Sequence, residues 1–300
     1  MRVVKTIAEM QSACRELRMR GLVLGFVPTM GALHEGHLSL VRRARSECDT
    51  VVASIFVNPL QFAPGEDFAK YPRTFEADCR SLETEGVDVL FAPDAAEMYP
   101  KGSVTTVTVS EVGDRLDGAS RPGHFTGVAT VVAKLFHAVA PTRAYFGQKD
   151  AAQLAVLRQM VRDLNFDVEL VSCAIVRDTD GLALSSRNKY VSAIERRHAL
   201  VLHRTLLQLE RMIAEGERLS TALVQRGMEI LSAEAGIRVD YLAIVDANTL
   251  LPVTSAETGT LVAVAAYVGS TRLIDNFLVT HDSNIRKSDS IPRLVDGRRV

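Results

Sequence analysis

Residues 22–37 read LVLGFVPTMGALHEGH, and this stretch decides the predicted fold. Its first half is a short apolar run that ends at Pro28, whose ring favours an extended conformation in the preceding residue. We therefore predict a buried strand over 22–27. Its second half is a polar turn with two histidines, followed by a segment with an apolar helical face formed by Leu38, Leu40, Val41 and Ala44. The stretch is a strand, a turn and the start of a helix.

The alternation of strand and helix continues along the first part of the chain. Strands are predicted at 51–57, 87–91, 143–146 and 168–176, and helices around the apolar faces of 128–139 and 154–164. Strands that alternate with helices form mainly parallel sheets, because a parallel crossover needs a long connection. The predicted fold class is α/β, with a Rossmann-like doubly wound parallel sheet.

The pattern changes after about Ser192. Two long helical stretches precede apolar strands at 239–245 and 260–267, which indicates a second, smaller α+β domain at the C-terminal end. We expect the first domain to span 1–184 and the second 185–280. The last stretch, 281–300, has few large apolar residues and is predicted to be a disordered tail.

Composition restricts the class of partner. The 35 basic and 36 acidic residues nearly cancel, which favours small-molecule substrates over nucleic acid or a membrane surface. Cys14, Cys48, Cys79 and Cys173 form no C-x-x-C pair and are predicted to be free thiols in a reducing compartment. Neither a secretory leader nor a membrane-length apolar run is recognisable, so we expect a cytoplasmic protein.

The turn at 28–37 lies where ligands bind in a doubly wound sheet, at the carboxyl end of a strand. We expect Gly31 and Gly36 to let the backbone approach a phosphate, and the following helix to present unpaired N–H groups. His34 and His37 suit a polyphosphate whose charge moves during reaction. Metal ligation and a structural role are the alternatives, although H-E-G-H lacks the H-E-x-x-H spacing of zinc proteases.

Two further segments offer phosphate-binding groups. Residues 178–188 contain an Asp-Gly turn and then Ser185, Ser186 and Arg187, which we expect on a mobile loop able to close over a triphosphate. The structural alternative is a solvated loop before a helix cap at Ser192.

The other segment is 145–150, at a strand-to-helix junction. Lys149 can place a charge on a phosphate, and Asp150 can cap the next helix or hold a ribose hydroxyl. Lysine and aspartate also occur at helix starts for structural reasons. The turn at 121–124 makes Arg121 and His124 secondary candidates of open role.

Together these segments resemble the pantothenate synthetase family, within the HIGH-motif nucleotidyltransferase superfamily that also includes class I aminoacyl-tRNA synthetases. Residues 34–37 match the HIGH signature, and 184–187 are similar to the KMSKS counterpart. Other similar segments cover nearly the whole chain except the tail: 27–37, 56–62, 71–73, 121–125 and 147–150. Family members often have methionine at the position of Leu184, an apolar swap of similar size.

The resemblance implies a ligase of pantothenate biosynthesis. It condenses (R)-pantoate with β-alanine, using ATP as a substrate together with Mg²⁺, and gives pantothenate, AMP and pyrophosphate through a pantoyl-adenylate. It also implies that the first domain binds ATP and pantoate, that the second acts as a lid, and that the chain is a homodimer without nucleic-acid or membrane partners.

The resemblance also implies site residues. The catalytic set is His34, His37, Lys149 and Arg187, with His37 as the acid. The ATP-binding residues are Met30, Gly31, Ala32, Leu33, His34, Glu35, Gly36, His37, Gly147, Gln148, Lys149, Asp150, Val176, Leu184, Ser185, Ser186 and Arg187. The pantoate and β-alanine residues are Gln61, Gln153, Met30 and Phe62. The metal ligands stay open, with Asp78 a weak magnesium candidate.

Three other functions fit part of the pattern. Another HIGH-motif adenylyltransferase, one that makes a dinucleotide cofactor, would share the two-histidine turn but would not need Gln61 and Gln153. A tRNA ligase would need an anticodon-binding extension or a basic surplus, neither of which is apparent. A non-catalytic nucleotide sensor would not need so many charge-stabilising groups.

Overall fold

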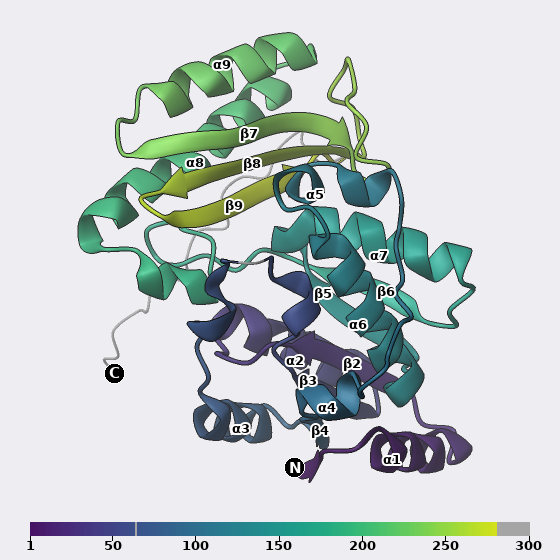
Figure 1. Cartoon of the computed structure of the whole chain (residues 1–300). Helices are drawn as coiled ribbons and strands as arrows, with labels where there is room; N and C mark the ends of the chain where they lie inside the picture. The colour runs from purple at the N-terminus through teal and green to yellow at the C-terminus, as the bar shows by residue number, and fades with distance from the viewer. Residues whose placement is uncertain (64, 281–300) are drawn as a thin grey trace, which may run out of the picture.

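The computed structural model describes residues 1–63 and 65–280. The predicted disordered tail lies outside the described residues. Two sheets organise this part of the chain, a six-stranded parallel sheet in the order β1-β4-β3-β2-β5-β6 and a three-stranded antiparallel sheet in the order β7-β8-β9 (Figure 1). The predicted fold class, a Rossmann-like doubly wound sheet with a smaller α+β domain, is confirmed.

The elements of the large domain follow the predicted alternation. Its strands are β1 (Arg2–Val4), β2 (Leu24–Thr29), β3 (Thr50–Ile55), β4 (Val89–Phe91), β5 (Arg143–Gly147) and β6 (Glu169–Cys173). Its α-helices are α1 (Ile7–Met19), α2 (Glu35–Glu47), α3 (Phe75–Thr84), α4 (Ala95–Met98), α5 (Asp117–Ser120), α6 (His124–Val139) and α7 (Ala151–Asp163). Short 3₁₀ helices are η1 (Pro59–Gln61), η2 (Asp67–Ala69), η3 (Val112–Asp114), η4 (Gln148–Asp150) and η5 (Ser186–Tyr190).

The order of the strands reverses beside β2, which makes this position the switch point of the sheet. From β2 the chain moves outward through β3 to β4, and then returns to the other side of β2 as β5 and continues to β6. Residue Gly25 of β2 therefore pairs with Val51 on one side and Arg143 on the other. Because all these strands are parallel, their carboxyl ends open onto one edge, and ligands of such sheets bind where the strand order reverses.

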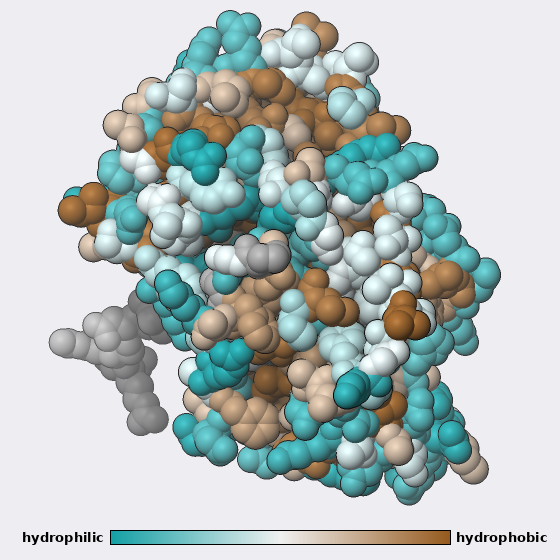
Figure 2. Space-filling view, viewed as in Figure 1, coloured by the Kyte–Doolittle hydropathy of each residue, from teal (hydrophilic) through white to brown (hydrophobic). Residues whose placement is uncertain are grey.

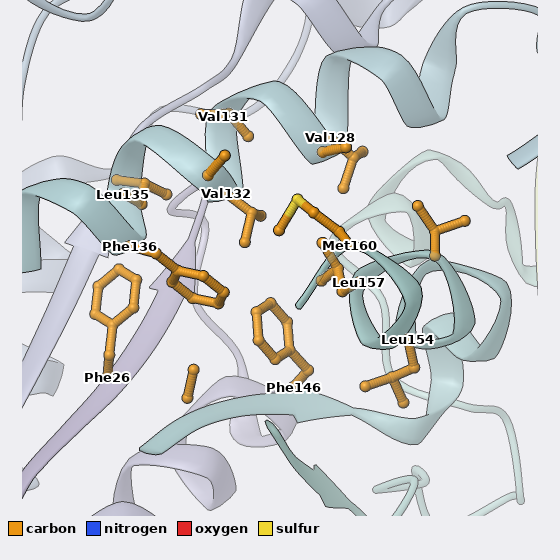
Figure 3. Packing of buried hydrophobic residues seen from close by; sticks show 14 of the residues in the cluster. Phe26, Val128, Val131, Val132, Leu135, Phe136, Phe146, Leu154, Leu157 and Met160 are labelled. Carbon is orange, nitrogen blue, oxygen red and sulfur yellow. The ribbon is translucent and has the colours of Figure 1, made fainter. Parts of the chain in front are cut away.

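Helices cover both faces of the large sheet. On one face α1, α6 and α7 pack against side chains such as Phe26 and Phe146, which point toward Phe136 and Leu157 (Figure 3). On the other face α2 and α3 pack against a second cluster. Both faces of the sheet are buried, which explains why β2, β3 and β5 read as apolar runs rather than as alternating patterns.

The small domain consists of α8 (Ala193–Ala214), α9 (Ser220–Ser232), β7 (Ile237–Asp246), β8 (Thr260–Val268) and β9 (Thr271–Leu278). Side chains of β8 alternate between two clusters: Val262 and Val264 pack with α8 and α9, whereas Leu261 and Ala263 join the core of the large domain. The small sheet therefore lies between its own helices and the large domain (Figure 1). Hydrophilic and apolar residues are mixed around the recess where the two parts meet (Figure 2).

Largely buried ion pairs join the two domains. Arg272 of β9 contacts Asp117 of α5 at 2.6 Å and Asp240 of β7 at 2.7 Å, and Asp117 is buried. Removing one member of such a group leaves an uncompensated charge, so the contact resists separation of the domains. The boundary at 184/185 stays a prediction.

We predict that Leu157→Ala lowers the free energy of unfolding by about 2–5 kcal/mol, because it removes a fully buried side chain from the cluster in Figure 3. Urea unfolding followed by circular dichroism measures the change. The matched control is Leu164→Ala, whose side chain is half exposed and should change the midpoint little. Equal loss of stability in both variants would contradict this placement of the core.

Candidate active site

A cavity of about 250 Å³ opens at the switch point between β2 and β5. It is lined by Pro28, Thr29, Met30, His34, Gly36, His37, Leu40, Phe56, Asn58, Gln61, Tyr71, Arg121, His124, Val128, Val131, Val132, Leu135, Tyr145, Phe146, Gly147, Lys149, Asp150, Gln153, Ala174, Ile175, Val176, Leu184, Ser185, Ser186 and Arg187. The three segments predicted to carry chemistry therefore meet at one place.

The turn after β2 is fixed from behind by a buried carboxylate. Asp78 of α3 accepts hydrogen bonds from the backbone N–H groups of Ala32 and Leu33, both at 2.9 Å, and from the hydroxyl of Thr74 at 3.1 Å. Gly31 needs its φ of +79°, and a Cβ there would lie 3.0 Å from an Asp78 oxygen. Asp78 thus uses both oxygens to hold the turn, and it does not line the cavity.

The two histidines cap the helix that they begin. His34 is the N-cap of α2, and its Nδ1 accepts from the Gly36 N–H at 3.2 Å, while Nδ1 of His37 accepts from the His34 N–H at 3.3 Å. Their ring centroids are 4.1 Å apart. Since each Nδ1 accepts, the neutral imidazoles carry their proton on Nε2. Both rings line the cavity and are able to donate to a ligand from Nε2.

One expectation about this turn is wrong. The N–H groups of Ala32, Leu33, His34 and Gly36 are already bonded to Asp78 or to the imidazoles, so they are not available to a phosphate as predicted. Gly36 serves a different purpose, because a Cβ there would lie 2.9 Å from the His34 ring. The side chains of His34 and His37, in contrast, line the cavity.

Burial sets the charge of both rings. It lowers the pKa of His34 to about 4, with Lys149 contributing further repulsion, and it lowers the pKa of His37 to about 3, with His34 as the next cause. Both imidazoles are therefore neutral near pH 7. An anionic ligand beside them would counteract these effects and raise both values.

Lys149 enters the cavity from η4, and the small domain fixes its backbone. Asn276 of β9, which is buried, donates from Nδ2 to the carbonyl oxygens of Gln148 and Lys149 at 3.1 and 2.9 Å. Gln148 in turn donates to the Asn276 oxygen at 3.1 Å and accepts from Ser172, so it supports the junction from outside the cavity. Of the two roles considered for Asp150, a helix cap or a ribose contact, the side-chain cap is not formed.

The serine-arginine segment forms the start of η5. Ser185 is its N-cap and accepts from the Arg187 N–H at 3.3 Å, and buried Ser186 lies 3.3 Å from the hydroxyl of Tyr71. All three predicted residues, 185–187, line the cavity. The segment is thus a short helix rather than the predicted loop, while the helix cap at Ser192 is confirmed by a capping box with Glu195.

Another part of the cavity lining combines amides with an apolar wall. Asn58 donates to the Gly127 carbonyl at 3.0 Å and to Gln61 at 3.2 Å, and Gln61 donates to the sulfur of Met30 at 2.9 Å. A Cβ at Gly127 would lie 2.3 Å from the Leu60 carbonyl oxygen, so only glycine allows η1 to pack so closely on α6. The wall consists of Val128, Val131, Val132 and Leu135 of α6.

Arg121 and His124 lie between this cavity and a smaller neighbouring one. Arg121 pairs with Glu66 at 2.7 Å and contacts Nε2 of His124 at 3.0 Å, and Nδ1 of His124 is 2.8 Å from the Gln61 carbonyl oxygen. Burial, reinforced by Arg121, lowers the pKa of His124 to about 4. These two residues therefore support the backbone of Gln61.

Most predicted site residues line the cavity, but not all. Gly31, Ala32, Leu33, Glu35, Gln148 and Phe62 do not, and their predicted substrate contacts stay predictions. Glu35 pairs with Arg42, and Phe62 packs against Phe68 and Tyr71. Sequence reasoning did not assign Asn58, Tyr71 or the α6 wall to the site. The wall was interpreted only as a helix face toward the core, because the same apolar residues of α6 both pack in the core and line the cavity.

No preformed metal centre occurs among residues 1–63 and 65–280, where no three His, Cys, Asp or Glu side chains are arranged to hold an ion. Asp150 is the carboxylate among the residues that line the larger cavity. This donor set fits Mg²⁺ carried by a nucleotide, since that ion keeps several waters and takes phosphate oxygens with one or two carboxylates.

The switch-point cavity, paired imidazoles and cationic side chains define a class: an ATP-dependent enzyme of the Rossmann-like nucleotidyltransferase type. The model of the pantoate-beta-alanine ligase family matches residues 2–278. A pantothenate synthetase of Acidobacterium capsulatum is 61% identical over 290 residues, covering 93% of this chain and 97% of that protein. One of Koribacter versatilis is 57% identical over 286 residues, covering 95% and 98%.

Solved structures of pantothenate synthetases are also similar to this chain. The crystal structure of pantothenate synthetase from Thermus thermophilus matches with a TM-score of 0.87 and 50% identity, covering 93% of this chain and all of that one. The Francisella tularensis ligase, complexed with β,γ-ATP and β-alanine, matches with a TM-score of 0.75 and 34% identity, covering 93% and 97%. The chain belongs to the pantoate–β-alanine ligase family and is an ATP-dependent ligase that joins pantoate to β-alanine. An adenylyltransferase making a dinucleotide cofactor is not favoured.

The described residues include no helix with the length and apolar character needed to cross a membrane. All four cysteines are free thiols, as predicted.

We predict that His34 and His37 stay neutral, with the proton on Nε2, down to about pH 5 in the ligand-free protein, because burial disfavours the imidazolium. Both values lie below the ordinary 6.5, so protonation favours the unfolded chain. The neutral histidines therefore leave stability unaffected above the ordinary pKa of 6.5, and the protein loses stability as the pH falls from there toward about 4 for His34 and about 3 for His37.

Long-range ¹H–¹⁵N spectra of histidine-labelled protein report tautomer and charge. Signals are assigned with His34→Gln and His37→Gln. A titration midpoint near 6.5 for either ring, or a proton on Nδ1, would contradict the geometry of the turn.

Proposed function

We propose that the cavity carries out both halves of the reaction with the residues that line it. The pantoate carboxylate attacks the α-phosphorus of ATP, and the bond to the departing pyrophosphate breaks. The free amine of β-alanine then attacks the acyl carbon of the pantoyl-adenylate, loses a proton, and releases AMP. The observation that supports this proposal is the meeting of neutral imidazoles, a lysine and a serine-arginine segment beside an amide-lined apolar pocket.

The triphosphate lies, in this proposal, between α2, η4 and η5. His34 and His37 donate from Nε2 to phosphate oxygens, and Lys149 and Arg187 neutralise the charge that moves onto the leaving pyrophosphate. Because the histidines start neutral, they stabilise charge as hydrogen-bond donors. His37 becomes an acid only after the bound anion raises its pKa. This sharpens the expectation that His37 is the catalytic acid.

The pantoate lies at the other end. Amides of Gln61 and Gln153 match its carboxylate and hydroxyls, since an amide both donates and accepts. Its two methyl groups match the α6 wall, with Met30 beside Gln61. Such a fit would hold the carboxylate in line with the α-phosphorus, which is the main requirement of the first step.

The small domain supports the site by contacts with the backbone of η4. Its strand β9 fixes the backbone of Lys149 through Asn276, and residues 185–187 begin the chain segment that leads into α8. We assign the exclusion of water from the acyl-adenylate to this segment as a lid. Mg²⁺ would be held by the triphosphate and Asp150, and it would neutralise phosphate charge.

The remaining assignments concern assembly and location. A homodimer follows from the resemblance of the sequence to its family, and a cytoplasmic location agrees with free thiols and small-molecule substrates. Static light scattering and fractionation of cells test these two assignments independently of catalysis.

We predict that His37→Ala or Lys149→Ala lowers pantoate-dependent exchange of pyrophosphate into ATP by at least about a hundredfold, as for loss of a charge-stabilising donor. Lys5→Ala, at an exposed position remote from the cavity, is the matched control and should retain full exchange. Near-normal exchange in both active-site variants would overturn the assignment.

We also predict that Gln153→Leu raises the KM for pantoate by about tenfold or more and leaves the KM for ATP nearly unchanged, because a hydrogen-bonding amide is replaced by an apolar group of similar size. Initial rates with one substrate varied at a time measure both constants. Gln159→Leu, on the same helix but outside the cavity, is the control. A change confined to ATP would contradict the proposed orientation of the two substrates.

A further inference from the structure

Two adjacent residues of β9, Asp275 and Asn276, are buried polar residues, each 3% exposed. β9 is an edge strand of the small sheet and contacts the large domain at η4 (Figure 1). A carboxylate and an amide at such buried positions are costly unless other groups bond them. Their partners therefore show what the strand holds in place.

The two side chains point to opposite faces of the small sheet. Asp275 is paired in register with Val264 of β8, which packs with α8 and α9, and Asn276 is paired with Ala263, which joins the core of the large domain. Side chains of directly paired residues point to the same face of a sheet. Asp275 therefore faces the helices of the small domain, whereas Asn276 faces the large domain.

Asn276 holds the segment that carries Lys149. Its amide donates to the carbonyl oxygens of Gln148 and Lys149 at 3.1 and 2.9 Å, and it accepts from the Gln148 side chain at 3.1 Å. Gln148 in turn accepts from the hydroxyl of Ser172 on β6 at 2.9 Å. One chain of hydrogen bonds thus joins β9, η4 and β6. A shift of β9 would move the backbone from which Lys149 enters the cavity.

Asp275 holds the turn that leads to residues 185–187. Its two oxygens accept from the Arg177 guanidinium at 2.6 and 2.9 Å, and the same guanidinium donates to the Gly181 carbonyl at 3.2 Å. Gly181 has a φ of +95°, and a Cβ there would lie 2.6 Å from the ring of His203 on α8. The turn is therefore fixed between Arg177 and α8.

The turn transmits this constraint to the serine-arginine segment. The Leu184 N–H donates to the Val176 carbonyl at 3.0 Å, which closes the segment between them into a short hairpin. Arg177 lies inside this hairpin, and Ser185 follows it directly as the N-cap of η5. Because the hairpin is closed by its own hydrogen bonds, the contact between Arg177 and β9 also sets where η5 begins.

We propose that Asp275 and Asn276 are positioning residues for the adenylation step, and that together they fix the distance between Lys149 and residues 185–187 across the triphosphate. The proposal rests on the roles of these two segments in the proposed function. Stabilisation of moving charge depends on placement, and a shift of about 1 Å caused by a remote substitution can lower a rate about a hundredfold. A single strand of the small domain thus places both groups.

The first test removes the hydrogen bonds of Asn276. Asn276→Ala and Asn276→Asp both lose the N–H donors, so the kcat of pantoate-dependent pyrophosphate exchange should fall by about tenfold or more in each. The KM for ATP should change by less than about threefold, because Lys149 acts on charge that develops in the transition state. An unchanged kcat in either folded variant, or a change confined to KM, overturns the proposal.

The second test asks whether each residue acts through the segment that it holds. Asn276→Ala should lower exchange by less than about twofold in a Lys149→Ala background, since the ammonium that it positions is already absent. Asp275→Asn should lower exchange by about tenfold in the wild type and by less than about twofold in an Arg187→Ala background. Multiplicative losses in either cycle overturn the proposal, because a merely structural residue lowers the activity of every background alike.

Asp240→Asn is the matched control for the junction between the domains. Asp240 contacts Arg272 at 2.7 Å at the same junction, and it lines neither cavity. Its substitution should lower the melting temperature and keep exchange within about twofold of the wild type. A loss of exchange as large as that of Asn276→Ala overturns the proposal, since the junction as a whole would then set the rate.

The single variants Lys149→Ala and Arg187→Ala separate this proposal from the proposed function. Near-normal exchange in both would refute the assigned chemistry, whatever the variants of β9 show. Strong loss in both, with full exchange in Asn276→Ala and Asp275→Asn, would refute only the positioning role.

Discussion

The parallel pairing of β2 between β3 and β5 is the constraint on which the rest of the structure depends. Parallel strands need crossovers over the faces of the sheet, and they all end at the same edge. The reversal of strand order beside β2 leaves an opening there. The turn at 28–37 and the junction at 147–150 must therefore meet, although more than a hundred residues separate them in the sequence.

The site at that opening is held by polar groups that fix its backbone; Asp78 and Asn276 lie outside the cavity lining, whereas Arg121 and His124 are part of it. Asp78 fixes the turn from α3, Asn276 fixes the Lys149 backbone from β9, and Arg121 with His124 supports Gln61. Each is a buried or half-buried polar group with its hydrogen bonds satisfied, which is the condition for such groups to stabilise a unique geometry. Positioned backbones place the two imidazoles, Lys149 and Gln61 in the lining of the cavity.

Burial gives His34 and His37 a lower pKa than a histidine has in water. A histidine in water is partly charged near neutrality, whereas His34 and His37 are neutral donors until an anion arrives. The resting site thus avoids placing two imidazolium ions 4.1 Å apart next to Lys149. A triphosphate bound beside these rings, as proposed, would raise both pKa values, which links the electrostatics of the cavity to the chemistry of adenylation.

The sequence by itself determined the alternation of elements, the parallel sheet and the three segments that carry chemistry, because apolar runs, helical periodicity and turn residues are local signals. It also identified the family, through 34–37 and the segments similar to it. The sequence wrongly suggested that the backbone N–H groups of the turn are unpaired. It did not assign Asn58, Asn276 or the α6 wall to the site. Only the tertiary structure decided those, since whether an N–H is free, an imidazole neutral or an apolar face exposed to a cavity depends on which distant residues pack against it.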